Sequence, residues 1–171
     1  MMSWKKAVRA MRGRIERIAY IGWRGIDYEA ITLDKEAFTG LIGPSGAGKS
    51  TLVMCLDYAL LPDRKVLDIR PISDVQDPHQ AGMDTLLARI NPAYGYAYVV
   101  LDVQTRHGKR LLAGIHARGE NGRGELTRFY IDNYPIDAPL QEAFRVLDGD
   151  GQYYPDLQDL SKHLAGHGFD L

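Results

Sequence analysis

The sequence has one cysteine and no long apolar run. The single cysteine, Cys55, excludes an internal disulfide, which favours a reduced, cytoplasmic compartment over a disulfide-stabilised secreted fold. No apolar stretch approaches the roughly 20 residues that a membrane-spanning helix needs. The N-terminus also lacks the apolar core of a signal peptide. We therefore expect a cytoplasmic protein with no membrane partner.

An excess of charge of one sign is also missing, because the chain has a formal net charge of -1. No overall field therefore favours nucleic acid or a membrane surface. The first 25 residues differ, since Glu16 is the one acidic side chain among many basic ones. This local excess hints at an anionic partner such as DNA, and a solvated basic helix face explains it equally well. The basic residues are Lys5, Lys6, Arg9, Arg12, Arg14, Arg17 and Arg24.

Apolar patterns of strand and helix period, separated by turn signals, predict a single α/β domain over residues 1–171. We expect five successive segments in it. They are a basic N-terminal helix (1–14); strands, a glycine-rich loop and a helix (15–61), with a short buried strand at 38–42 and the helix at 50–61; a variable loop rich in proline and aspartate (62–92); an antiparallel β meander (93–134); and a C-terminal segment with a helix capped by Asp156 (135–171).

The stretch GPSGAGKST, residues 43–51, fits the phosphate-binding pattern G-x-x-x-x-G-K-[ST] at every fixed position. Its glycines let backbone N–H groups turn toward phosphate oxygens, and the helix that follows adds the positive end of its dipole. Lys49 is the predicted catalytic residue because it supplies a charge for the β- and γ-phosphates, and Ser50 offers its hydroxyl to Mg²⁺. The predicted nucleotide-binding residues of this cradle are Gly43, Pro44, Ser45, Gly46, Ala47, Gly48, Lys49, Ser50 and Thr51.

The other parts of a nucleotide-hydrolysing site are missing or ambiguous. Hydrolysis needs a carboxylate for Mg²⁺ and a group that orients the attacking water. Asp102 ends an apolar stretch as such a carboxylate would, but Val103 follows it where a base is expected, so a polar residue on a meander strand is the preferred interpretation. No LSGGQ-like signature occurs in the chain. The five histidines show no metal-ligand spacing and are interpreted as surface residues.

These features together resemble the first half of an ABC-type ATPase head, and within that class the structural-maintenance-of-chromosomes (SMC) ATPases. Residues 15–63, with a strand, an aromatic–basic turn, a second strand and the cradle, are similar to the opening of MukB-type bacterial condensins and of the related ATPase of Wadjet plasmid-defence systems. The stretches 93–124 and 151–164 look like later parts of the same lobe. Ser45 departs from the pattern, because many SMC heads carry asparagine there.

The resemblance implies a P-loop ATPase lobe that binds ATP and Mg²⁺, with the β meander flanking the cradle. It implies ATP held between two heads, and hence a complementary C-terminal ATPase lobe and a second head as partners. Accessory SMC-complex subunits and DNA are further expected partners, in chromosome organisation, partition or plasmid defence. Arg24, in the turn where the family places a basic residue near the nucleotide, is a predicted second contact.

The family's Q-loop, signature, Walker B pair and switch histidine find no trusted counterpart here, so hydrolysis by this chain alone is not expected. Three alternatives stay open. A small nucleotide kinase also uses GPSGAGKST, but such kinases usually begin with the cradle strand, which here starts at Phe38. An ABC transporter ATPase fragment would need a membrane partner and an early Q-loop. A nucleotide-gated binding module without catalysis overlaps with the preferred hypothesis.

Overall fold

The structure, a computed structural model, describes residues 13–33, 39–60, 89–105, 107–120, 123–148 and 151–171. Five strands form one sheet in the order β2-β1-β3-β4-β5, and each neighbouring pair is antiparallel. A two-stranded hairpin, β6–β7, stands apart from it. The elements are β1 (Arg14–Trp23), β2 (Ile26–Thr32), α2 (Lys49–Leu60), β3 (Tyr96–Gln104), β4 (Arg110–Glu120), β5 (Arg123–Ile131), the 3-10 helix η2 (Leu140–Ala143), β6 (Val146–Asp148), β7 (Gly151–Tyr153) and α4 (Leu157–Gly166).

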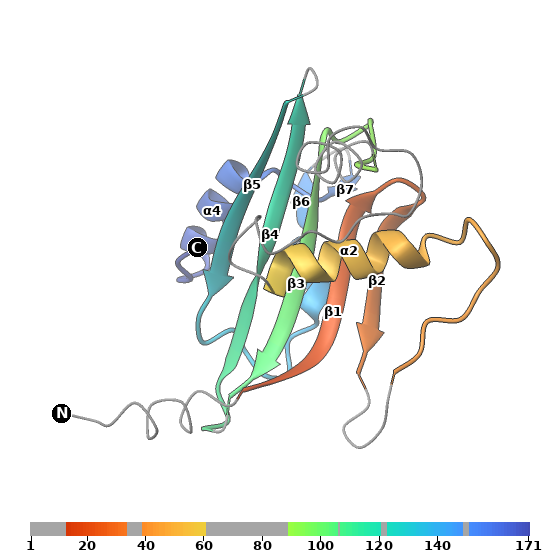
Figure 1. The fold of residues 1–171 in the computed structure, drawn as a ribbon. Coiled ribbons are helices and arrows are strands. Elements are labelled where there is room, and N and C mark those ends of the chain that lie inside the picture. Colours follow the sequence, from red (N-terminus) through yellow and green to blue (C-terminus); the bar gives the residue numbers. More distant parts are fainter. Residues whose placement is uncertain (1–12, 34–38, 61–88, 106, 121–122, 149–150) are drawn as a thin grey trace.

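The sheet has a hydrophobic core on each of its two faces. The central strand β3 contributes to both, because successive side chains along a strand point to opposite faces. Ala97, Val99 and Leu101 belong to one buried cluster, and Tyr98 and Val100 belong to the other. All five are at most 5% exposed. Helix α2 crosses the first face, while α4 lies on the opposite side of the sheet, near β5 (Figure 1). The result is a three-layer arrangement with the sheet in the middle.

The α2 face is held by a core between the helix and the first strands. Cys55 and Tyr58 of α2 pack among Ile18 and Tyr20 of β1, and Cys55 is fully buried. The Tyr20 hydroxyl donates a hydrogen bond to the Leu52 carbonyl at 3.2 Å, which ties the first half of the helix to β1. The helix predicted over 50–61 is therefore confirmed from Lys49 to Leu60.

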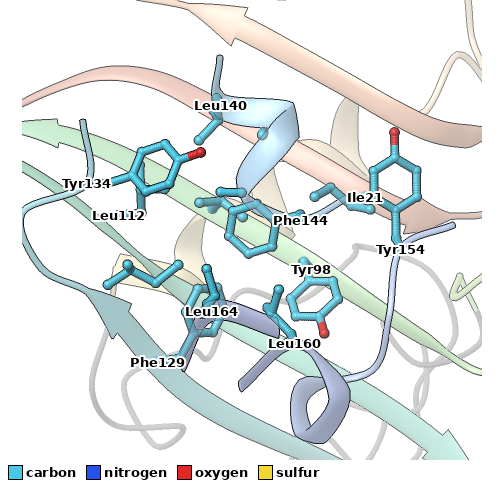
Figure 2. Close-up of a cluster of buried hydrophobic side chains, with 14 residues drawn as sticks. Ile21, Tyr98, Leu112, Phe129, Tyr134, Leu140, Phe144, Tyr154, Leu160 and Leu164 are labelled. Atoms are coloured by element: carbon cyan, nitrogen blue, oxygen red, sulfur yellow. The ribbon is translucent and has the colours of Figure 1, made fainter. Parts of the chain in front are cut away.

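The opposite face carries a larger, aromatic core that the C-terminal segment closes. Phe144, which directly follows η2, lies between the sheet and α4 and is fully buried with Leu160 (Figure 2). The Tyr98 hydroxyl donates to the Pro155 carbonyl at 2.7 Å, just before α4 begins. Asp156 caps α4, because its carboxylate accepts the N–H groups of Gln158 and Asp159. This confirms the predicted capped helix, while η2 and the β6–β7 hairpin were not predicted.

The meander predicted over 93–134 is confirmed by the consecutive antiparallel pairs of β3, β4 and β5. The predicted end of the basic helix is wrong at Arg14, which is the first residue of β1. The rest of that helix, residues 1–12, and most of the variable loop, residues 61–88, lie outside the described residues. Within the described part of the chain, no helix has the length and apolar character of a membrane span.

Candidate phosphate-binding site

The cradle occupies the turn that leads directly into α2. Gly46 and Gly48 have φ angles of 82° and 83°, a left-handed conformation that residues with a Cβ atom rarely adopt. The turn is closed by a hydrogen bond of 3.3 Å from the Ala47 N–H to the Pro44 carbonyl. The helix begins at once, since the Leu52 N–H bonds the Gly48 carbonyl at 3.0 Å. The fixed glycine Gly48 and the neighbouring Gly46 therefore stand where the backbone favours glycine.

Lys49 folds back over the loop that precedes it. Its Nζ donates to the carbonyls of Gly43 and Pro44, both at 2.7 Å. The ammonium thus lies over the loop, at the N-terminal end of α2. The free N–H groups and dipole of a helix start also favour an anion at this place. A phosphate bound there would gain a charge-assisted hydrogen bond from Lys49.

The remaining cradle residues fall into an exposed group and one buried residue. Residues 43–47 and Ser50 are exposed, so the Ser50 hydroxyl is accessible to an ion from solvent. Thr51 is only 6% exposed, and its Oγ1 accepts a hydrogen bond from Nη1 of Arg89. Arg89 lies in the proline- and aspartate-rich stretch that the sequence assigned to a variable loop, and no motif pointed to it.

Arg24 lies in the turn between β1 and β2 and is exposed. Its backbone N–H donates to the Arg89 carbonyl at 2.7 Å. Among the described residues, no hydrogen bond joins its guanidinium to the cradle. Its role as a second nucleotide contact stays a prediction.

The buried strand predicted at 38–42 is wrong for the residues that the structure describes. Residues 39–44 have no regular secondary structure, and Leu41 and Ile42 are 39% and 99% exposed. A strand needs a neighbour to satisfy its backbone, and the five-stranded sheet pairs β1 with β2 and β3 instead. The segment thus enters the cradle as an exposed apolar stretch.

Asp102 is not a metal ligand of the cradle, because it lies on the sheet face opposite α2. Tyr98 and Val100 of the same strand point to that face as well. It is 3% exposed and paired with two arginines. Arg110 donates through Nε and Nη2 to the two carboxylate oxygens at 2.8 and 3.0 Å, and Arg17 donates through Nε at 2.9 Å. The preferred interpretation of Asp102, a polar residue on a meander strand, is therefore confirmed.

Arg110 also connects Asp102 to the chain beyond β5. Its Nη1 donates to the carbonyls of Pro135 and Ala138 at 2.7 and 2.6 Å, and its guanidinium lies 5.1 Å from the ring centre of Tyr134. A planar fork of donors suits this combination of carboxylate, carbonyl and aromatic partners. The network fixes the segment that leads to η2, so it is structural.

His116 corrects the interpretation of all the histidines as surface residues. It is 6% exposed, on β4, with its ring centroid 4.9 Å from that of Tyr98. Burial lowers its pKa from the ordinary value of 6.5. Among the described residues, no group of three or more histidine, cysteine, aspartate or glutamate side chains is placed to hold a metal ion.

A comparison with protein families identifies the family of this chain. Residues 10–169 match the family model described as MukB N-terminal. The chain belongs to the MukB N-terminal family. This confirms the resemblance to the head of SMC-like condensins that the cradle and the flanking strands indicated.

Two curated relatives are similar to this chain at low sequence identity. The chromosome partition protein MukB of Vibrio vulnificus (strain YJ016) is 29% identical over 128 residues, which are 72% of this chain and 8% of the relative. The chromosome partition protein MukB of Haemophilus ducreyi is 26% identical over 136 residues, or 78% of this chain and 9% of the relative. The chain thus spans a small fraction of the length of the curated relatives it matches.

Proposed function

We propose that this chain is the ATP-binding N-terminal lobe of an SMC-like ATPase that acts on DNA. The carrying observation is the left-handed glycine turn at the start of α2, with the Lys49 ammonium folded over it. Lys49 would neutralise the phosphates, and Ser50 would meet Mg²⁺ when the nucleotide is bound. The MukB N-terminal family match supports an SMC-like role for this loop.

Hydrolysis would require a complementary C-terminal lobe. The described residues supply a cradle, but their buried carboxylate, Asp102, is neutralised by Arg17 and Arg110 on the other face of the sheet. Leu41 and Ile42, exposed beside the cradle, and Val53 and Leu60 on α2 offer an apolar surface that such a lobe would cover. A second head that binds on ATP and accessory subunits belong to the same proposal.

Chromosome partition is the role that the relatives' names support. Plasmid defence is an alternative within the same class of machine, and DNA is the partner in both. A nucleotide kinase is disfavoured, because kinases with this motif build a parallel sheet with alternating helices, whereas neighbouring strands of the described sheet are antiparallel. An ABC transporter fragment is disfavoured by the family match.

The test is calorimetric titration of the chain with ATP and Mg²⁺, beside the Lys49→Ala variant. We expect Lys49→Ala to weaken ATP binding about 10- to 100-fold, because a phosphate loses a charged hydrogen-bond partner. Lys109→Ala, at an exposed lysine of the β3–β4 turn, is the matched control and should leave the affinity unchanged. Equal affinities for wild type and Lys49→Ala would refute the cradle assignment.

A further inference from the structure

Arg89 is bonded to two parts of the candidate site at once. Its Nη1 donates to Oγ1 of Thr51, in the first turn of α2. Its backbone carbonyl accepts the N–H of Arg24, in the β1–β2 turn, at 2.7 Å. One residue therefore joins the helix that follows the cradle to the turn that carries the second predicted nucleotide contact.

The backbone that follows Arg89 is anchored to the end of β1. Ile90, 5% exposed, forms an antiparallel bridge with Trp23, and the Asn91 N–H donates to the Gly22 carbonyl at 2.8 Å. Trp23 is itself 1% exposed, and its Nε1 donates to the Tyr98 carbonyl at 2.8 Å. The guanidinium of Arg89 is therefore presented to Thr51 from a backbone that is fixed to the sheet.

The chemistry of this hydrogen bond sets the direction of the Thr51 hydroxyl. A guanidinium has no acceptor, so Oγ1 of Thr51 must accept from Arg89 and its own hydrogen must point elsewhere. Thr51 lies two residues after Lys49, within the turn whose free N–H groups favour an anion. A second cation beside this turn opposes the helix dipole unless negative charge is close by. The positive charge of Arg89 therefore suits a phosphate bound close to this turn.

We propose that Arg89 is a positioning residue of the nucleotide site. It orients Thr51 and fixes the first turn of α2 relative to the β1–β2 turn. Binding of a nucleotide in the cradle would therefore change the position of the turn that carries Arg24. This inference rests on the proposed binding of ATP. It adds Arg89 to the site and couples the cradle to the β1–β2 turn.

Tryptophan fluorescence provides the test, because Trp23 is the last residue of β1 and directly precedes Arg24. Trp4 is the other of the chain's two tryptophans. In a Trp4→Phe background, the signal reports Trp23 alone. We expect saturating MgATP to change it. Arg89→Ala should weaken ATP binding about tenfold, the cost of one hydrogen bond to a charged group, and should remove most of the fluorescence change at saturation.

The coupling is tested by a double-mutant cycle with Thr51→Val, which removes the hydroxyl at nearly constant size. Each single variant should lower the affinity, and the double variant should bind no worse than the weaker single one. Thr51→Ser, which keeps the hydroxyl, should bind like wild type. Arg118→Ala, at an exposed arginine of β4, is the charge-matched control and should change neither signal. If Arg89→Ala lowers the melting temperature strongly, the Thr51→Val and Thr51→Ser pair carries the test.

The two levels of the proposal fail in different ways. If wild-type chain binds no ATP by calorimetry, the proposed function falls and this inference with it. If wild type binds ATP while Arg89→Ala and Thr51→Val keep the affinity and the full Trp23 signal, the positioning role alone is overturned.

Discussion

On one face of the sheet, α4 and η2 bury Leu160 and Phe144 completely; on the other, α2 leaves Val53 and Leu60 at 45% and 48% exposure, and Ile42 before it is 99% exposed. The first face is closed by aromatic packing and the Arg17–Asp102–Arg110 network. The second carries the candidate cradle together with apolar side chains in contact with solvent. The contrast indicates that the face away from the candidate cradle is the more completely closed one, while the cradle face is the one fit to receive a partner.

The largest effect should come from breaking the ion network of the closed face. Asp102→Ala leaves Arg110, whose side chain is 4% exposed, without its carboxylate, and removal of one partner of a buried pair typically costs about 3–5 kcal/mol. We expect a loss of this size in urea unfolding. Arg14→Gln, which breaks the exposed pair of Arg14 with Glu16, should cost less than about 1 kcal/mol. Similar losses for both variants would show that the network does not stabilise the lobe.

A smaller effect comes from comparing one helix residue on each face. Leu160→Ala in α4 removes a fully buried side chain and should cost about 2–5 kcal/mol. Val53→Ala in α2 removes a side chain that is 45% exposed, so its cost should stay within about 0.5 kcal/mol. Thermal unfolding of both variants measures the difference. A loss at Val53 equal to that at Leu160 would mean that the α2 face is as closed as the other.

The smallest effect should be a dependence of stability on pH from His116. Because burial lowers its folded-state pKa below 6.5, the unfolded chain binds a proton more readily. The stability contribution is therefore complete above the unfolded pKa and is lost as pH falls below it, toward the lower folded pKa. Each unit between the two pKa values corresponds to about 1.4 kcal/mol.

The check is the free energy of unfolding between pH 7.5 and 5, in wild type and in His116→Gln. The charged groups that act on His116 are Asp156 before α4, Arg118 on β4 and Glu125 on β5, and they are unchanged in this variant. We expect a shallower pH dependence in His116→Gln than in wild type. His107→Gln, at an exposed histidine, should behave like wild type. An identical slope in all three would exclude His116 as its source.

Local patterns predicted the elements well, because their signals lie within a few residues. The apolar run that ends at Asp102 predicted a strand there, the helix after the glycine loop was found within one residue at its start, and Asp156 was identified as a cap. These are features that short-range geometry decides. Gly48 is of the same kind, since the motif fixes a glycine there and its backbone is left-handed.

What the sequence could not predict depends on neighbours far along the chain. The central position of β3, between β1 and β4, is one such feature. That position buries Asp102, and its partner Arg17 lies on β1, out of reach of any local pattern. The stretch at 38–42 is apolar enough for a strand, but the described sheet offers it no partner. The role proposed for Arg89 likewise depends on its contacts with Thr51 and Arg24, which are distant in the sequence.

We propose that this lobe binds ATP but does not complete the hydrolytic site by itself. The most direct measurement is ATP turnover beside ATP binding, on the same purified chain and on Lys49→Ala. We expect Mg²⁺-dependent binding that Lys49→Ala weakens, with no turnover above the rate of that variant until a complementary lobe is added. Sustained turnover by the chain alone that Lys49→Ala abolishes would contradict it, because the remaining catalytic groups would then lie within these residues.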